Sequence, residues 1–420
     1  MLRLFHNADF ARLFLGRLVT NAGDSLYAVA AVWLVYTLGG STLYTGLAGF
    51  LTTLLVALQF LAGPLVDRWP ARGTLVATQV IQGLLVLVIP VAAALGRLTV
   101  PVVLIVMPLA ALVGQMAFPT EMAALPRVVG PEHLVRANSA FSFAYQGAEM
   151  AFSALAGVLI AVIGAVALYV VDLGTFVVAA ALFAMLRLRP APRETAPTPR
   201  EERGAWRRYG ADLSAGLRVV RRSVLLKMVT ASIVVNLMIG ATLAVLPAFA
   251  AARGGAKAYG ALTAALAAGS LLGALLAPLV ERYALSRLMV TSTTISCLAW
   301  TGAGLAPWAA ATVLLFGAAW VPIGATNVVF YAVVQRVVPA GLLGRVSSVL
   351  ISVSAVVLPL GYLVGGGAGA RLGSGAVVIA SGVSFAAVAA YWLLDPQLRR
   401  FPSVNTVDPA QYGLGSADSA

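Results

Sequence analysis

Four carboxylates lie inside long apolar stretches of the sequence, where an ionised side chain would have no water around it. They are Asp24, Glu121, Glu149 and Asp172. An ionised Asp at the centre of a bilayer-spanning helix costs about 2.5–3.5 kcal/mol on insertion scales, so each group needs a partner, a water-filled cavity or a proton. Because burial favours the neutral form of a carboxyl group, such groups can bind and release protons near neutral pH. All four are therefore candidate proton-coupling residues.

The carboxylates also have structural interpretations. Asp24 shares a helix face with Asn21, three residues earlier, so coupling to protons or substrate competes with a hydrogen bond to a neighbouring helix. For Glu149 the alternative is a polar contact where two helices cross. Glu121 lies six residues before Arg127, a spacing that favours an ion pair at a gate.

A short charged segment stands between the second and third apolar stretches. This segment, residues 63–73, has a weaker copy at 277–282, at an offset of 214. A second echo aligns residues 127–139 with 336–348 without gaps, at an offset of 209. Two echoes at nearly the same offset indicate two repeats. We expect their charged turns to form a cytoplasmic gate that pairs across the repeats when the inner face is closed: Gly63, Asp67, Arg68, Arg72, Arg127, Arg136, Glu281, Arg282, Arg336 and Arg345.

Twelve apolar stretches must position these groups. Each is close to the roughly 20 residues that a helix needs to cross a bilayer, and the glycines and prolines within them are compatible with helix in lipid. They span residues 11–38, 43–66, 73–95, 100–122, 137–163, 165–186, 224–250, 259–280, 284–304, 308–334, 346–370 and 375–394. We predict an all-α membrane protein with twelve transmembrane helices in two parallel six-helix pseudo-repeats.

The composition agrees with an integral membrane protein and explains the charge. Of the 420 residues, 60% are hydrophobic and 10% are charged, with a net charge of +13. That charge would indicate nucleic acid in a soluble protein, but here the basic residues lie between apolar stretches, as the positive-inside rule expects. Only Arg97, Arg253, Lys257 and Arg371 fall in predicted outer loops, and the other basic residues, Arg17 included, are assigned to inner loops and tails. We therefore expect cytoplasmic termini and no nucleic-acid partner.

Four regions follow from these patterns. Residues 1–190 form the first six-helix half, 191–222 a cytoplasmic linker, 223–395 the second half, and 396–420 a polar tail that we expect to be disordered. The linker is proline-rich and ends in an amphipathic basic helix from Asp212 to Arg222. Such a helix can bind a partner such as calmodulin, but the inner membrane surface is favoured beside a membrane-embedded body.

Residues 63–73 resemble the loop between the second and third helices of the major facilitator superfamily. That motif has a Gly, then an Asp followed directly by a basic residue, and then two consecutive basic residues. Gly63, Asp67, Arg68 and Arg72 match it, and Gly73 replaces the last basic residue. The segments 15–27, 125–139 and 343–348 resemble the exporter branch that includes macrolide efflux pumps and the enterobactin exporter.

The resemblance covers about residues 3–395 and implies a substrate cavity between the halves. It implies that the helix carrying Asp24 lines this cavity and that the helix carrying Asp172 is an outer one, which favours a structural role for Asp172. The candidate cavity residues are Asn21, Trp33, Gln115, Phe118, Tyr145, Asn236, Asn327 and Tyr331, with packing or interfacial anchoring as the alternative for each. Two features depart from many drug antiporters: the fifth helix lacks a Gly-Pro pair, and the fourth lacks a membrane-embedded arginine.

No pattern in the sequence indicates an enzyme, a metal site or a cofactor. Cys297 is the only cysteine, and His6 and His133 lie far apart, so neither a disulfide nor a metal cluster is expected. The first apolar stretch carries Asp24 and is too long for a signal peptide, so we expect it to remain as a helix.

Together these features predict a secondary active transporter of the plasma membrane that works by alternating access. The favoured activity is proton-coupled export of small amphipathic, drug-like molecules. A metabolite, siderophore or lysolipid carrier is the alternative within transport, and a non-transporting membrane sensor is a less favoured one outside it. The expected partners are a small-molecule substrate, protons and the lipid bilayer, and a monomer is expected because the fold requires no partner chain.

Overall fold

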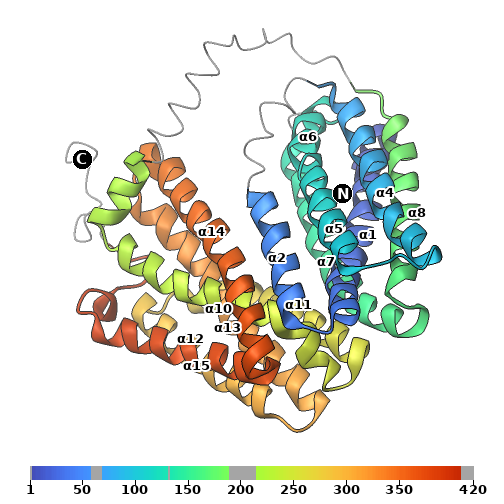
Figure 1. Ribbon diagram of the computed structural model, residues 1–420. Helices are drawn as coiled ribbons and strands as arrows, with labels where there is room; N and C mark the ends of the chain where they lie inside the picture. Colours follow the sequence, from blue (N-terminus) through green and yellow to red (C-terminus); the bar gives the residue numbers. More distant parts are fainter. Residues whose placement is uncertain (1, 58–68, 131–132, 189–213, 408–420) are drawn as a thin grey trace. The chain divides into compact units, whose positions relative to one another are not determined.

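The structure is a computed structural model that describes residues 2–57, 69–130, 133–188 and 214–407. Within these residues the chain is helical and contains no strand (Figure 1). The first helices are η1 (Leu2–His6), α1 (Ala8–Gly39), α2 (Thr42–Ala57), α4 (Ala71–Ala94), α5 (Val100–Gly114), α6 (Ala117–Ala124), η3 (Leu125–Arg127), α7 (Leu134–Ile163) and α8 (Ala165–Ala184). They are followed by α10 (Leu225–Ala251), α11 (Gly255–Val280), α12 (Leu285–Leu305), α13 (Ala309–Val337), α14 (Ala340–Leu372), α15 (Ser374–Leu394) and η5 (Leu398–Arg400).

Eleven helical spans among the described residues are long and apolar enough to cross a membrane, and Thr42–Val56 is a shorter apolar helix. One of the eleven, Val100–Arg127, joins α5, α6 and η3 across a turn at Gln115 and Met116. These spans coincide with the predicted apolar stretches, which confirms the all-α membrane fold. The predicted helix at 43–66 can be followed only to Ala57, because residues 58–68 lie outside the described part, so its full length stays a prediction.

The chain forms two compact units, Met1–Ala196 with Ala250–Ala264, and Pro197–Phe249 with Ala265–Ala420. They divide the chain near the predicted boundary, except that residues 250–264 group with the first unit. The reason is close packing inside that unit, because the backbone of Gly260 lies directly against that of Gly157 on α7. Trp33 of α1 also stacks on Tyr259, with ring centroids 5.6 Å apart.

In the first unit α1 packs against α2, α5, α7 and α8, whereas α4 packs against α5, α6 and α8. The first turns of α1 place Phe10 in a fully buried apolar cluster that also contains Leu75 of α4 and Phe183 of α8. Phe10 and Phe14 contact Phe141 of α7, with ring centroids 6.0 and 5.4 Å apart. α1 therefore touches most of the helices in this unit, and its side chains reach several of the unit's interfaces.

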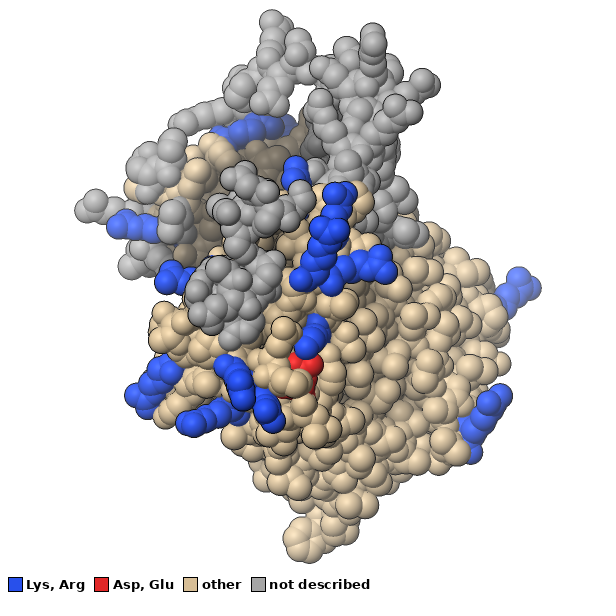
Figure 2. Space-filling model, turned by 90° about the vertical axis from the view of Figure 1, so that its left-hand side faces the viewer, with Lys and Arg blue, Asp and Glu red and all other residues tan. Residues whose placement is uncertain are grey.

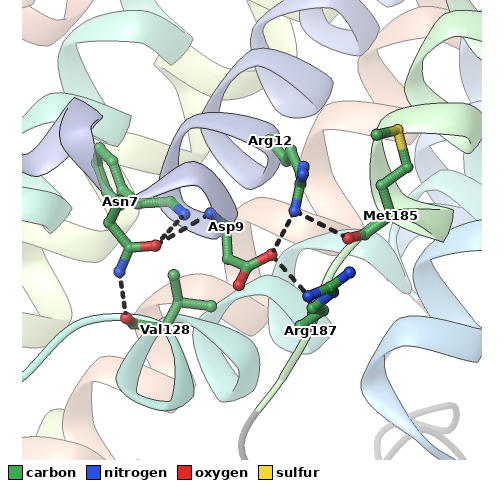
Figure 3. A network of polar contacts seen from close by, with 7 residues as sticks. Asn7, Asp9, Arg12, Val128, Met185 and Arg187 are labelled. Carbon is green, nitrogen blue, oxygen red and sulfur yellow. Dashed lines mark hydrogen bonds and ion pairs between the residues drawn. The ribbon is translucent and has the colours of Figure 1, made fainter.

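A polar network holds the beginning of α1 to two other parts of the chain (Figure 3). Asn7 is the N-cap of α1, since its Oδ1 accepts the backbone N–H of Asp9 at 3.0 Å, while its Nδ2 donates to the Val128 carbonyl at 2.9 Å. Asp9 Oδ1 accepts hydrogen bonds from Arg12 Nη1 and from the backbone N–H of Arg187, each at 3.0 Å. The segments that follow η3 and α8 are thereby fixed to the first turn of α1.

The second unit has an aromatic core. α12 packs against α13 and α15, and the buried Trp300 of α12 contacts Phe316 and Phe385, with centroid distances of 5.2 and 5.4 Å. Gly273 of α11 lies against the Val321 carbonyl of α13, where a Cβ atom would collide. Small residues at such positions allow helices in membranes to pack closely. In Figure 2 Lys and Arg side chains border a broad area without charge, as expected of a surface that faces lipid.

The segment after α15 is folded onto the second unit as far as residue 407. Leu398 and Phe401 are fully buried in an apolar cluster of that unit. The carbonyls of Pro402 and Phe401 accept the backbone N–H groups of Leu285 and Ser286, at 3.0 and 3.3 Å. Because the first N–H groups of a helix have no intrahelical acceptor, the segment caps α12. The predicted disorder is wrong for residues 396–407, and residues 408–420 lie outside the described part.

Asp395 fastens the start of this segment. Its Oδ2 lies 2.7 Å from Lys227 Nζ of α10, and its Oδ1 accepts the backbone N–H groups of Gln397 and Leu398 at 2.9 and 3.1 Å. Burial alone would raise the pKa of Asp395, but Lys227 and the two N–H groups favour the charged form. Together they hold the pKa of this carboxyl below its ordinary value.

A helix at residues 214–222 corresponds to the end of the predicted linker, whose residues 189–213 lie outside the described part. Val220 is buried in the apolar cluster of the second unit, and Gly216 lies against the Arg345 carbonyl of α14. The exposed side carries Arg218, Arg221 and Arg222. Gly216 and Val220 thus face protein, whereas the apolar Leu217 is exposed beside the arginines, so the contact of this helix with the inner membrane surface stays a prediction.

Candidate functional site

The first unit contains a cavity of about 460 Å³ whose wall comes from seven helices. The lining residues are Arg17, Asn21, Asp24, Ser25, Tyr27 and Ala28 of α1, Thr52 of α2, Gln82 and Val86 of α4, Met107, Ala110, Ala111 and Gly114 of α5, Gln115, Phe118 of α6, Tyr145, Glu149 and Ser153 of α7, and Phe176 of α8. The wall therefore combines apolar and aromatic side chains with many polar and charged groups, a mixture that can fix both the position and the charge of a small molecule.

Helical spacing explains why the charged groups share this wall. Arg17, Asn21 and Asp24 follow one another at intervals of four and three residues on α1, so they lie on one face of the helix. On α7, Tyr145 and Glu149 are four residues apart and also share a face. The two helices pack against each other, which brings both polar faces to the same cavity.

Arg17 is locked by contacts with two other helices. Its Nε lies 2.9 Å from Glu121 Oε2, and the side chains of this pair are only 8% and 2% exposed. Arg17 Nε and Nη2 both donate to the Tyr145 hydroxyl, and the guanidinium carbon lies 4.8 Å from the centre of the Tyr145 ring. The assignment of Arg17 to an inner loop or tail is wrong, because it is a buried residue of α1 whose charge is compensated by Glu121.

Unlike Glu121, which is paired with Arg17, Asp24 and Glu149 form no ion pair within the described residues. Both line the cavity, and neither side chain has an ion pair or a hydrogen bond within the described residues. Three neighbouring polar atoms on the wall are also buried without a hydrogen-bond partner in that part of the chain: Asn21 Nδ2, Thr52 Oγ1 and Gln82 Oε1. The cavity thus presents charged and polar groups whose bonding capacity is unused.

Asp172 lies behind α1 and does not line the cavity. A Cβ atom on Gly23 would collide with Asp172 Oδ1 and Thr175 Oγ1, so the absence of a side chain at Gly23 is what lets α8 approach α1 here. Thr175 Oγ1 donates to Asp172 Oδ1 at 3.0 Å, whereas Asp172 Oδ2 is buried without a partner among the described residues. This environment suits a neutral carboxyl group that packs between two helices.

The predicted cavity residues fall into two groups. Asn21, Gln115, Phe118 and Tyr145 line the cavity together with Asp24 and Glu149. The others do not line it: Trp33 stacks on Tyr259, Asn236 Nδ2 donates to the Ser232 carbonyl of its own helix at 2.9 Å, and Asn327 and Tyr331 are exposed on α13. The last three belong to the second unit, and their place in a substrate site stays a prediction.

The predicted gate residues are only partly described. Gly63, Asp67 and Arg68 lie outside the described residues. In the first unit Arg72 and Arg136 are exposed and Arg127 is half-buried, and in the second unit Glu281 is half-buried while Arg282, Arg336 and Arg345 are exposed. Arg282 Nη2 donates to the Tyr283 hydroxyl at 3.1 Å, and the guanidinium lies over that ring. The gate therefore stays a prediction.

Sequence reasoning missed several residues of this cavity. Arg17 stands seven residues, or about two helical turns, before Asp24, so the spacing could have placed it on the same face. Gln82 and Thr52 carried no signal of this kind, because an isolated amide or hydroxyl in an apolar stretch is common. The described residues contain no group of three or more His, Cys, Asp or Glu placed to hold a metal ion.

Comparison with known proteins identifies the family and the fold. The chain matches the family model described as Major Facilitator Superfamily over residues 13–349. It is similar to the inward-facing, unoccupied structure of a bacterial homolog of the human lysosomal transporter Spinster, with 16% identity and a TM-score of 0.68, over 92% of this chain and 96% of that chain. It is also similar to an inward-facing bacterial homologue of the iron transporter ferroportin, with 17% identity and a TM-score of 0.67, over 93% and 99% of the two chains.

A third similar structure is that of the nucleoside transporter NupG, with 14% identity and a TM-score of 0.67, over 91% of this chain and 98% of that one. No curated protein sequence matches the chain. At such identities the structural likeness shows a shared fold and does not transfer a substrate.

Proposed function

This chain belongs to the major facilitator superfamily, and from that membership we propose that it is a proton-coupled exporter of small amphipathic molecules. The family and the transporters that share its fold make it a multi-pass membrane transporter and not an enzyme. Proton coupling, export and the class of substrate are the parts that we propose.

The proposal of proton coupling rests on the surroundings of the carboxylates in the cavity. Asp24 and Glu149 line a single cavity without an ionic partner in the described residues, whereas Glu121 is paired with Arg17. An ionised carboxylate inside a membrane-embedded unit is costly unless something positive neutralises it. A proton is the simplest such species, so Asp24 and Glu149 are the side chains that we assign to proton binding.

The transport cycle follows from this charge change. In the proposed cycle protons bind Asp24 and Glu149 from one side of the membrane and leave when substrate enters from the other side. The protonation state then biases which face of the transporter is open, by the alternating-access mechanism of such folds. Glu121 and Asp172 are coupled to this cycle less directly, since one is neutralised by Arg17 and the other lies outside the cavity wall.

The remaining assignments come from the sequence. We place the protein in the plasma membrane with both termini in the cytoplasm, because Lys and Arg concentrate in loops of one side. Export is the direction implied by the resemblance of residues 15–27, 125–139 and 343–348 to the exporter branch. The mixture of apolar, aromatic and polar groups on the cavity wall supports an amphipathic substrate, and we propose that the transporter works as a monomer.

Transport in proteoliposomes tests the function. Liposomes with an acidic interior are offered a panel of amphipathic compounds, and accumulation is compared with that in liposomes without a pH gradient. We expect gradient-driven accumulation of at least one compound, and a loss of roughly tenfold or more in Asp24→Asn and Glu149→Gln. Asp9→Asn is the matched control, because it makes the same chemical change on α1 but lies in the polar network of Figure 3, away from the cavity wall.

Accumulation that is independent of the gradient and survives Asp24→Asn and Glu149→Gln would contradict proton coupling. Accumulation driven only by an alkaline interior would contradict export. If no compound of the panel moves, but Asp24→Asn and wild-type protein release equal numbers of protons on acid-to-neutral titration, Asp24 is not the proton-binding group.

A further inference from the structure

We propose that the cavity of the first unit selects organic cations, and that Asp24 and Glu149 hold the positive charge of the substrate. The class meant is an amphipathic ammonium or other onium ion with an apolar body. This assignment rests on the proposed transport function, since it names what the same cavity carries.

The charges on the wall do not balance. Arg17 is the one basic residue on it, and its charge is already compensated by Glu121 at 2.9 Å. This leaves Asp24 and Glu149 as uncompensated carboxylates within the described residues. The helices around them add no cation nearby: α2, α5, α6 and α8 contain no Lys or Arg, and those of α4 and α7, Arg72 and Arg136, lie in the first turn of their helices.

The two carboxylates also lie at similar positions along the axes of α1 and α7. Phe10 and Phe14 of α1 contact Phe141 of α7, and Arg17 contacts Tyr145 further along both helices, so α1 and α7 run in the same direction. Asp24 is seven residues beyond Arg17, and Glu149 is four residues beyond Tyr145. At a rise of 1.5 Å per residue these positions are about 10 and 6 Å above the Arg17–Tyr145 contact. A height difference of about 4 Å lets one cationic group interact with both.

An independent observation points to a hydrogen-bond donor in the cavity. Gln82 is 4% exposed and lines the cavity, and its Oε1 accepts no hydrogen bond from the described residues, while its Nε2 donates to the Ala110 carbonyl at 3.3 Å. A buried acceptor without a donor is unfavourable, because it has lost its hydrogen bonds to water. An N–H group of a bound ammonium ion would satisfy Gln82 Oε1 inside the same cavity that holds Asp24.

The apolar part of the wall fits the body of such a molecule. Phe118, Tyr145 and Phe176 supply aromatic surface, and Val86 supplies aliphatic surface. Aromatic faces attract onium groups as well as apolar ones. Metal cations fit less well, because the described residues contain no group of three His, Cys, Asp or Glu that could hold one. Anions fit least, since the guanidinium that could receive them is held by Glu121 and Tyr145.

Two probes of the same shape and opposite charge test the proposal. Binding of tetraphenylphosphonium and of tetraphenylborate to the purified full-length protein is measured by calorimetry in detergent at neutral pH. We expect the cation to bind at least about a hundredfold more tightly than the anion. Asp24→Asn and Glu149→Gln should each weaken cation binding by roughly tenfold, a loss of about 1.4 kcal/mol, whereas Asp9→Asn should leave it unchanged. Asp24→Glu retains the charge and should retain most of the binding, which separates charge from folding.

Equal affinity for the two probes, or cation binding that survives the loss of both carboxylates, would overturn the proposal. The proposal would also be overturned if Mn²⁺ bound saturably, if this binding depended on Asp24 and Glu149, and if tetraphenylphosphonium did not compete with it. These outcomes are separable from failure of the proposed function. Charge-selective binding without gradient-driven transport would refute proton-coupled export only, and gradient-driven transport with preference for the anion would refute the cation assignment only.

Discussion

Replacing Arg17 with methionine should destabilise the first unit strongly, because it leaves the Glu121 carboxylate buried without a cation. Methionine keeps an unbranched side chain of similar reach, so the change removes charge with little loss of volume. The control is Arg12→Met on the same helix. Arg12 pairs with Asp9 at 3.0 Å, nearly the same distance as the 2.9 Å of the Arg17–Glu121 pair. The pairs differ in burial, and the Arg12–Asp9 pair lies within one helix whereas the Arg17–Glu121 pair joins α1 to α6.

The expected magnitudes follow from distance and exposure. Two unit charges 2.9 Å apart attract by about 6 kcal/mol at an effective dielectric constant of about 20. Part of this attraction is offset by the cost of removing both charges from water, and the measured cost of breaking one buried pair is about 3–5 kcal/mol. The Arg12–Asp9 side chains are 28% and 23% exposed. A pair of that kind contributes about 1 kcal/mol or less.

Unfolding in mixed micelles, with increasing fraction of a denaturing detergent, measures the difference in free energy. We expect Arg17→Met to lower the free energy of unfolding by about 3 kcal/mol or more and Arg12→Met by about 1 kcal/mol. The double variant Arg17→Met with Glu121→Gln should lose less free energy of unfolding than the sum of the two single variants, by about 1–3 kcal/mol. The reason is that neither charge then remains unpaired. A coupling free energy below about 0.5 kcal/mol, or equal costs for the two arginines, would refute the buried ion pair.

Three further perturbations have directions set by the structure. Gly23→Leu should lower the free energy of unfolding by about 2–3 kcal/mol, because the new side chain must enter the α1–α8 contact. The control is Gly147→Ala, where nothing lies within 4 Å of a new Cβ. This change should be neutral or stabilising in the same assay. Phe401→Ala removes a fully buried ring and should cost about 3–5 kcal/mol, measured as a fall in thermal unfolding temperature. Because the pKa of Asp395 is lowered in the folded protein, its stabilising pair with Lys227 is complete above the ordinary carboxyl pKa of about 4 and is lost as the pH falls below it. The unfolding temperature of Asp395→Asn should therefore fall less than that of the wild type between pH 5 and 3, and parallel curves would contradict this.

The helices could be predicted because bilayer thickness and apolar composition set their length. The pattern predicts helices at 165–186 and 375–394, and the structure has α8 at Ala165–Ala184 and α15 at Ser374–Leu394. Agreement is poorer where a helix continues beyond the apolar stretch. The predicted helix at 346–370 begins six residues earlier, at Ala340, because the added residues Leu342 and Leu343 pack against the apolar cluster of the second unit. Hydropathy reports on lipid and says little about such contacts.

The same limit explains the tail. Residues 396–407 are polar on average, so composition predicts disorder, yet three buried apolar residues hold them to the second unit and two backbone hydrogen bonds join them to α12. A few specific contacts therefore outweigh average composition. The network at Asn7 was more accessible to prediction, since an Asn directly before an apolar helix is a common N-cap.

The candidate site shows why residue type alone does not assign a role to a carboxylate in an apolar stretch. Asp24, Glu121 and Glu149 are chemically equivalent in the sequence, and all three lie in apolar stretches. The structure separates them through Arg17, which is within reach of Glu121 and Tyr145 but forms no ion pair with Asp24. That distinction depends on a contact among α1, α6 and α7, and spacing along one helix cannot reveal it. Removal of Arg17 would return Glu121 to the group of uncompensated carboxylates. The charge preference that we infer for the cavity is therefore a property of this three-helix contact and not of any short motif.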